Sequence, residues 1–310
     1  MDQAAVLSSR VEVCATDWVE AFAGFLRGEG MAEKTLRAYL QDCRAFAVWY
    51  EGANGEPFAP GALTSTDLRT FRAEAVQRKA APATFNRQRA TLKRLASWAI
   101  GTGLLQYDPF RGVERVEENE QAPRWMTQQE AHRLVRAMEL QIAGARTEAG
   151  KAQAIRDRAM VGMMLYAGLR VAEVCALDLS DIVLTARKGK VTVWGKGSKR
   201  REVPLGAELR EILRAYLSYR GEQAGPLFDG KRQGLRMGTR GVEHRLEALR
   251  GLAGLGPEVT PHALRHTFAK RLVDKGMQLP LVQKLMGHAR LETTARYTRP
   301  GWEDLEAAVE

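Results

Sequence analysis

The sequence predicts a mainly helical protein of two domains, with one small β-hairpin in the second. Apolar residues recur at helical spacing along most of the 310 residues, whereas residues 190–205 change to the alternating pattern of a hairpin. A charged stretch without apolar periodicity, residues 111–124, separates the halves of a chain that is long for one core. We therefore expect a helical domain over residues 1–110, a linker over 111–124 and an α+β domain over 125–310.

The N-terminal domain is predicted to contain four helices. Residues 52–61, rich in Gly and Pro, are expected to end the second helix. Thr64 with Asp67 three residues later is a capping signature for the third helix, and Pro82 suits the first turn of the fourth. The predicted helices cover residues 15–28, 33–50, a span that begins near 64, and 82–101.

The C-terminal domain is predicted to be helical around its hairpin. Thr127 with Glu130 forms a second capping signature, and residues 143–153, small and polar, are expected to form an exposed loop. The apolar run 159–169 predicts a buried helix, because it falls short of the about 20 residues that span a bilayer.

The composition favours a polyanionic partner. The net charge is +10, and Lys and Arg that neutralise phosphates release bound counterions. Three widely spaced cysteines, Cys14, Cys43 and Cys175, predict neither a disulfide framework nor a cysteine zinc site. Since the N-terminus also lacks a charged start followed by an apolar run, we expect a cytoplasmic protein that is not bound to a membrane.

The fourth helix carries basic residues that could contact phosphates, namely Arg87, Arg89, Lys93 and Arg94. A merely solvated basic face is an equally good interpretation of this segment. Charge and position together select six candidate DNA contacts: Lys34, Arg87, Arg89, Lys93, Arg240 and Arg245.

Two segments of the C-terminal domain carry isolated cations that suit phosphate chemistry. In LYAGLRVAEV, Arg170 is followed three positions later by Glu173, which would share a helical face with it and could orient its guanidinium for a phosphate. A surface ion pair is the simpler interpretation. Lys196 lies between two glycines on the hairpin turn, where it could donate a proton to a leaving oxygen. Gly-Lys-Gly is also an ordinary turn, and it does not match a Walker loop.

The string TPHALRHTFAKRL is more specific. It begins with a Thr-Pro helix start and places His262 and Arg265 on one helical face. His262 and His266, four apart, could bind a metal, but Ala263 stands where the zinc-protease pattern needs a Glu. We therefore expect no metal site and interpret His266 as a packed residue behind the site.

The string LMGHARLETTARYTRP places His288 directly after Gly287 and Tyr297 nine positions later. A tyrosine phenol is a poor nucleophile at neutral pH unless cations lower its pKa or a base takes its proton. The cations and histidines of the other segments could supply both. A half-exposed packing tyrosine is the ordinary alternative.

In this order, the four segments resemble the tyrosine recombinases of the phage-integrase and Xer type. The similarity extends from about residue 15 to residue 299 and is closest to simple Xer-like integrases. It implies an N-terminal SAM-like core-binding domain that clamps DNA, followed by a catalytic domain. The implied catalytic residues are Arg170, Lys196, His262, Arg265, His288 and Tyr297, with Glu173 orienting the basic site.

The resemblance implies site-specific recombination of double-stranded DNA at a crossover site. Strands would be cut through a covalent 3′-phosphotyrosyl intermediate and exchanged through a Holliday junction, without metal, ATP or another cofactor. A homotetramer on DNA, with or without a second recombinase, is implied, with a helix over residues 301–310 docked on a neighbouring protomer. A frayed tail, or a helix docked on its own chain, is an equally ordinary interpretation of these residues. Two alternatives stay open: a non-catalytic DNA-binding accessory protein of the same fold, and a type IB topoisomerase-like enzyme that relaxes DNA.

Overall fold

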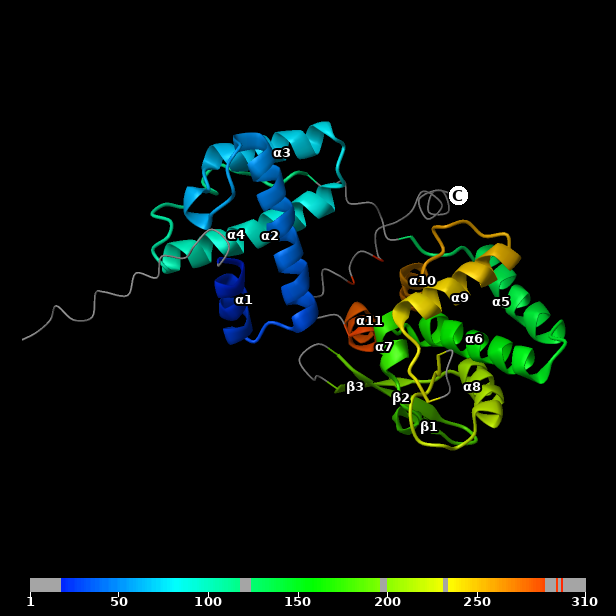
Figure 1. Ribbon diagram of the computed structural model, residues 1–310. Helices are drawn as coiled ribbons and strands as arrows, with labels where there is room; N and C mark the ends of the chain where they lie inside the picture. Colours follow the sequence, from blue (N-terminus) through cyan, green and yellow to red (C-terminus); the bar gives the residue numbers. More distant parts are fainter. Residues whose placement is uncertain are drawn as a thin grey trace, which may run out of the picture. The chain divides into compact units, whose positions relative to one another are not determined.

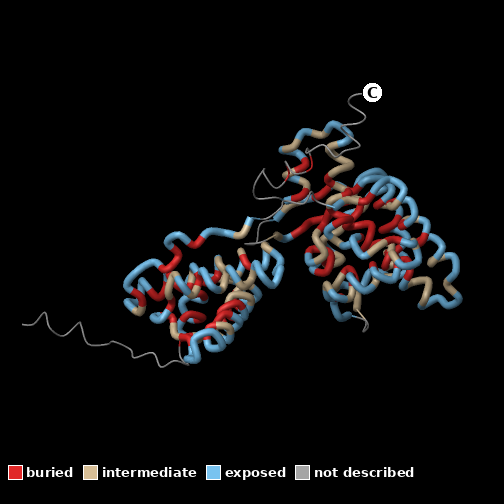
Figure 2. Tube along the Cα trace, turned by 90° about the horizontal axis from the view of Figure 1, so that it is seen from above, coloured by how far each residue is buried: buried red, intermediate tan, exposed pale blue. Residues whose placement is uncertain are grey.

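The computed structural model describes residues 18–117, 124–195, 200–230 and 234–287, together with Thr294 and Tyr297. The chain divides into two compact units, residues 1–120 and 121–310 (Figure 1). Each unit encloses its own core of buried residues, whose backbone is coloured red in Figure 2. The predicted class, mainly helical with a small sheet, is confirmed. Among the residues described, no helix is both long and apolar enough to cross a bilayer.

The first unit is a set of helices around an aromatic core. The ring of Phe46 lies 5.2 Å from those of Phe58 and Phe71, edge to face with both, a favoured arrangement of aromatic side chains. Its described elements are α1 (Trp18–Gly28), α2 (Glu33–Asn54), the 3₁₀ turn η1 (Pro60–Ala62), α3 (Ser65–Gln77) and α4 (Pro82–Gly101).

Local chemistry sets the helix ends of this unit. The Thr64 hydroxyl accepts from the N–H of Asp67, whose carboxylate accepts from the N–H of Thr64 at 2.9 Å, so the predicted capping box is confirmed. The predicted end of the second helix at residue 50 is wrong. α2 continues to Asn54, because the chain turns only at Gly55, whose φ of 75° is left-handed.

The second unit is built around α6 (Glu148–Ala167). The segment from Ala159 to Leu165 is buried on all sides, as expected for an apolar helix at the centre of a core. The helices packed against it are α5 (Gln128–Ala143), α7 (Val171–Ala176), α8 (Ala207–Arg220), α9 (Thr239–Leu252) and α10 (Pro261–Asp274). The short helix α11 (Leu279–Met286) packs against α10.

The loop predicted for residues 143–153 is present but shorter, because it covers only residues 144–147 between α5 and α6. α6 begins at Glu148, where the hydroxyl of Thr147 accepts from the N–H of Gly150 at 3.1 Å. The first turn of α6 is short of apolar side chains, which hid its helical periodicity. The capping box predicted at Thr127 is present at the start of α5.

A small antiparallel sheet completes the second unit. The predicted hairpin is confirmed as β2 (Gly189–Trp194) and β3 (Arg200–Pro204), with Val191 opposite Val203. A third strand, β1 (Ile182–Leu184), follows the 3₁₀ turn η2 (Leu179–Asp181) and pairs with β2. This strand was not predicted, since its three residues are too few to show alternation.

Candidate active site

The end of α6 sets the position of Arg170. Gly168 is left-handed, with a φ of 64°, and donates its N–H to the carbonyl of Met163, which terminates the helix. A Cβ at Gly168 would lie 2.3 Å from Cδ1 of Phe268, so the site requires glycine. Arg170 follows as the N-cap of α7. Its contact with Glu173 therefore arises from capping, not from a shared helical face.

The carboxylate of Glu173 organises a cluster of three arginines. Its oxygens accept from the backbone N–H of Arg170 at 2.8 Å and from Nη1 of Arg170 at 2.9 Å. Arg201 donates through both Nη atoms, one to each oxygen, at 2.8 Å. Nη1 of Arg265 lies 3.8 Å from Oε2. Burial opposes ionisation of Glu173, but the hydrogen bonds from Arg201 and Arg170 outweigh it and lower its pKa.

The same three guanidiniums hold the C-terminal end of α11. Each donates to one of three successive carbonyls: Arg201 to Leu285, Arg265 to Met286 and Arg170 to Gly287. The last carbonyls of a helix carry partial negative charge, which favours cations there. The arginine cluster therefore ties α11 to α7, α10 and β3, and fixes the point from which the chain continues to residue 288.

Arg265 is the most deeply buried cation of the cluster. Its side chain is 3% exposed, and its Nη1 also donates to the carbonyl of Gly168. Burial, followed by the nearby charge of Arg170, lowers the pKa of Arg265 to about 10. The guanidinium therefore stays charged at neutral pH.

Tyr297 lies against α10, where a histidine contacts its hydroxyl. The side chain is 2% exposed and packs with Ala269, Val282 and Met286. The phenol oxygen lies 2.6 Å from Nδ1 of His266, within hydrogen-bonding distance. His266, predicted to pack behind the site, is half-buried on α10 and contacts the tyrosine hydroxyl directly.

His262 lies one turn before His266 on α10. Its side chain is exposed, and its ring centroid is 6.2 Å from that of His266. Lys196 and His288 lie outside the described residues, so their predicted roles stay predictions. Within the described ranges, no three His, Cys, Asp or Glu side chains are grouped as a metal site requires.

Three of the six candidate DNA contacts have partners within their own unit. Each of these arginines ties two segments of its unit together. Arg87 pairs with the buried carboxylate of Asp42, Arg89 donates to the carbonyl of Val113 at 2.6 Å, and Arg245 donates to the fully buried Asp157 at 2.6 Å. Lys34, Lys93 and Arg240 are exposed.

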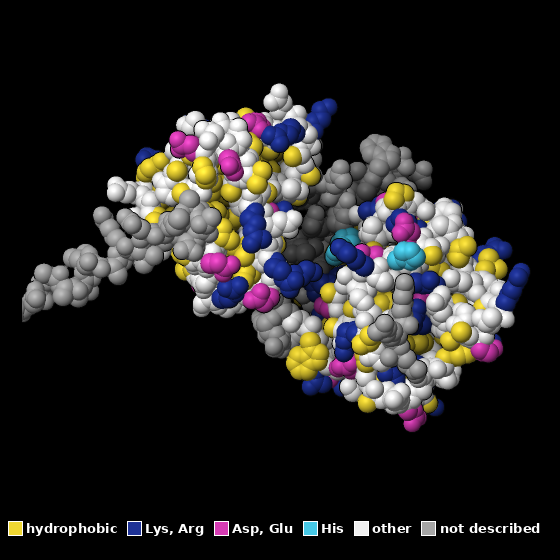
Figure 3. All heavy atoms as spheres, viewed as in Figure 1, with side chains coloured by type: hydrophobic (Ala, Val, Ile, Leu, Met, Phe, Trp, Pro, Cys, Tyr) yellow, Lys and Arg dark blue, Asp and Glu magenta, His cyan; other side chains and the backbone are white. Residues whose placement is uncertain are grey.

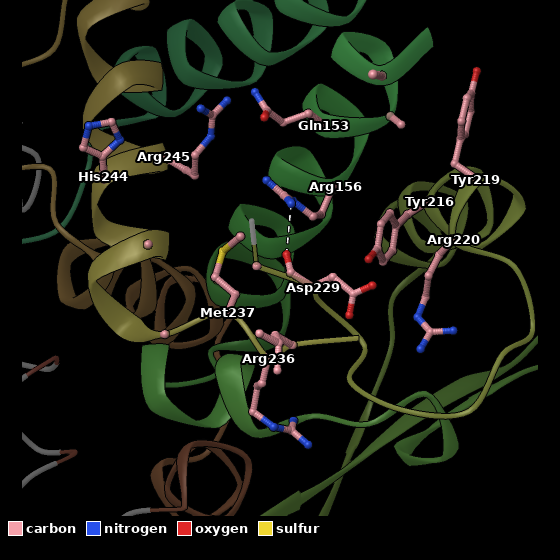
Figure 4. A pocket seen from close by; sticks show the side chains of 16 residues that line it. Gln153, Arg156, Tyr216, Tyr219, Arg220, Asp229, Arg236, Met237, His244 and Arg245 are labelled. Atoms are coloured by element: carbon pink, nitrogen blue, oxygen red, sulfur yellow. Dashed lines mark hydrogen bonds between the residues drawn. The ribbon is translucent and has the colours of Figure 1, made fainter. Parts of the chain in front are cut away.

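A hollow of about 1050 Å³ in the second unit is lined by none of the predicted catalytic residues that the structure describes (Figure 4). It lies among α6, α8, α9 and residues 229–230 and 235–238. Arg156 donates to the carbonyl of Asp229 at 2.9 Å, the dashed line in Figure 4, and Arg220 and Arg236 also donate to backbone carbonyls. The contact between Arg156 and Asp229 therefore ties two walls of the hollow together.

Comparison with known proteins gives the family. The model of the phage integrase family matches residues 124–302, more than half of the chain. The chain belongs to the phage integrase family. The family's N-terminal SAM-like domain matches residues 18–104, as the resemblance implied.

The sequences of similar proteins align with almost the whole chain of this integrase-family protein. The tyrosine recombinase XerC of Chromohalobacter salexigens is 35% identical over 296 residues, which cover 94% of each protein. That of Rhodospirillum centenum is 34% identical over 303 residues, 96% of this chain and 86% of that protein. The chain is thus an enzyme, a site-specific recombinase of the tyrosine type, as predicted.

Solved structures show the same fold at lower identity. The XerH site-specific recombinase bound to palindromic difH substrate superposes with a TM-score of 0.75 at 22% identity, covering 96% of this chain and 84% of that one. A lambda integrase (75–356) dimer bound to a COC′ core site gives 0.70 at 19% identity, covering 90% and 93%.

Two residues of this recombinase site, Arg201 and His266, were missing from the predicted set. A signal for Arg201 exists in the hairpin alternation, since it stands opposite the buried Val193 on the inward side of β3. An arginine at an inward position needs a buried partner. For His266 the signal is its spacing of one helical turn from His262.

Proposed function

We propose that this recombinase cleaves and rejoins double-stranded DNA at a specific crossover site, with the hydroxyl of Tyr297 as nucleophile. One observation carries the proposal: the phenol is hydrogen-bonded by His266, the residue directly after Arg265 on α10. The nucleophile is thereby held beside the helix that carries a buried cation suited to phosphate. DNA as the partner is supported by the solved relatives, which are described as bound to difH and to a core site.

In the proposed reaction, the oxygen of Tyr297 attacks the scissile phosphorus. A 3′-phosphotyrosyl bond forms as the bond to the 5′ oxygen breaks. His266 is in position to receive the phenol proton. The 5′ oxygen leaves with a proton from Lys196, the role that the resemblance implies.

Arg170 and Arg265 would stabilise the charge that builds on the non-bridging oxygens during this step. Their positions around Glu173 are fixed in advance by hydrogen bonds, so little reorganisation is required. His262 and His288 would donate hydrogen bonds to the same phosphate. The phosphotyrosyl bond conserves the energy of the broken diester, so a 5′-hydroxyl of another strand can reverse the step without ATP.

The two units would have different functions in this reaction. We assign DNA clamping to residues 1–110, a linker role to 111–124 and catalysis to 125–310, acting in the cytoplasm as a homotetramer that exchanges strands through a Holliday junction. In the view of Figure 3, Lys and Arg side chains, dark blue, are scattered over both units with acidic side chains between them. Lys34, Lys93 and Arg240 are the stronger candidates for DNA contacts because their side chains are exposed. The other three candidates, Arg87, Arg89 and Arg245, are held by partners within their own unit.

Capture of a covalent complex tests this function. The protein is incubated with genomic DNA fragments, and trapped fragments are sequenced, with Tyr297→Phe as the control. A protein-linked 3′ end at a recurrent sequence, absent from the control, is expected. Equal trapping by both proteins would refute Tyr297 as nucleophile, and efficient relaxation of plasmids without a specific site would favour the topoisomerase alternative.

His262 and His266 can be separated in the same assay. His266→Gln should slow adduct formation and shift its pH dependence, because the group that receives the phenol proton is lost. His262→Gln should slow it without that shift. The opposite pattern would assign proton transfer to His262.

A further inference from the structure

Arg201 lies in the interior of the catalytic unit, where a charged side chain requires compensating partners. It is the second residue of β3 and stands opposite Val193, which is buried. Its side chain is only 14% exposed. Burial of an unpaired guanidinium is costly, so its partners account for its position.

Those partners fill the acceptor sites of Glu173. A carboxylate offers about four lone-pair sites. Arg201 occupies two of them at 2.8 Å, while the backbone N–H and Nη1 of Arg170 occupy the other two at 2.8 and 2.9 Å. The carboxylate is therefore saturated, and Arg265 is left at 3.8 Å from Oε2, beyond hydrogen-bonding distance.

Removal of Arg201 would open two acceptor sites next to Arg265. An arginine forms a strong two-point pair with a free carboxylate, so Arg265 and Arg170 would both be drawn toward Glu173. The cluster would also fall from three guanidiniums to two around one carboxylate. Both effects weaken the attraction for a phosphate.

We propose that Arg201 is a positioning residue for the recombination step. It saturates Glu173 and so keeps Arg170 and Arg265 available to the scissile phosphate. Its Nε also donates to the carbonyl of Leu285 at 3.3 Å, and this hydrogen bond holds the end of α11. The inference rests on the proposed function, because it assumes that these two arginines bind the phosphate.

A double-mutant cycle tests the inference. Four full-length proteins are compared: wild type, Arg201→Gln, Glu173→Gln and the double variant. The rate of covalent adduct formation is measured in single turnover on a suicide substrate, and DNA affinity is measured separately by fluorescence anisotropy. Arg200→Gln is the matched control, since Arg200 is the preceding residue of β3, its side chain is 57% exposed, and it pairs only with Glu202 in the described part of the chain.

We expect Arg201→Gln to lower the adduct rate by about 10-fold to 100-fold, because small displacements of positioning groups cost this much. DNA affinity should change by less than about threefold, since most of it comes from phosphate contacts elsewhere. Arg201→Lys should lie between wild type and Arg201→Gln, because lysine restores the charge without the planar fork. Arg200→Gln should stay within about twofold of wild type.

In the Glu173→Gln background, Arg201→Gln should add less than about twofold, because no free carboxylate remains to attract Arg265. An equal loss of rate in both backgrounds would overturn the proposal, since independent structural damage is additive. If Arg201→Lys reacts as slowly as Arg201→Gln while its Tm is unchanged, the claim that the positive charge at this position supports adduct formation is refuted.

Inorganic phosphate separates this inference from the proposed function. The rise in Tm on adding phosphate is measured for the same four proteins and should be smaller in Arg201→Gln than in wild type, but equal in the two Glu173→Gln proteins. If wild type forms no adduct while this coupling holds, the proposed function fails, and only the control of phosphate binding by Arg201 through Glu173 stands. If adducts form but both cycles are additive, the inference fails and the function stands.

Discussion

Replacement of Gly168 by alanine should damage the active site without removing any catalytic group. Gly168 is left-handed, with a φ of 64°, and an added methyl would lie 2.3 Å from Cδ1 and 2.7 Å from Cε1 of Phe268. The left-handed backbone costs an alanine roughly 1–2 kcal/mol, and overpacking a buried contact costs roughly 1–3 kcal/mol. The second unit should therefore lose about 2–5 kcal/mol, a large share of the stability of a typical domain.

Gly168→Ala should also slow the catalytic step. The carbonyl of Gly168 accepts from Arg265, and Arg170 follows two residues later. A shift of this turn moves both arginines away from their positions around Glu173, so the rate of adduct formation should fall by about 100-fold. Urea unfolding of the full-length protein, analysed as separate transitions for the two units, measures the stability.

Gly251→Ala provides the matched control. Gly251 lies in α9 with no atom within 4 Å of its added Cβ, so alanine should be neutral or stabilise by up to about 1 kcal/mol. Phe268→Leu should restore part of the stability of Gly168→Ala, because it removes the ring that the methyl meets. A Gly168→Ala protein within about 0.5 kcal/mol of wild type would refute the argument from this contact.

Three further predictions concern single contacts. Thr127→Ala removes the capping box of α5 and should cost about 1 kcal/mol in urea unfolding of the second unit. Folding lowers the pKa of Glu173 from 4.5, so its contribution to stability is present above pH 4.5 and is lost as the pH falls through the folded pKa. The Tm of Glu173→Gln should therefore fall less than that of wild type when the pH is lowered below 4.5. Asp42, 3% exposed, accepts from Arg87 and from Thr91 at 3.0 Å, so Asp42→Asn should destabilise the first unit by about 1–3 kcal/mol, and an unchanged urea midpoint would contradict this.

The sequence was most informative where the chemistry is local. The capping boxes at Thr64 and Thr127 and the proline at the start of α4 involve residues within one turn of each other, and the structure has all three. The order of the arginine, His-x-x-Arg and tyrosine segments identified the family, since each segment carries its motif within a few residues. Where the local pattern was weak, at the start of α6 and the end of α2, the predictions were wrong.

Tertiary structure alone decided which of these groups meet. Arg201 and Glu173 are 28 residues apart, His266 and Tyr297 are 31 apart, and Arg245 and Asp157 are 88 apart. The sequence shows that each of these residues can carry a charge or a proton. Its partner depends on how helices and strands pack, because burial leaves a charged group stable only beside the particular donor or acceptor that packing brings within about 3 Å.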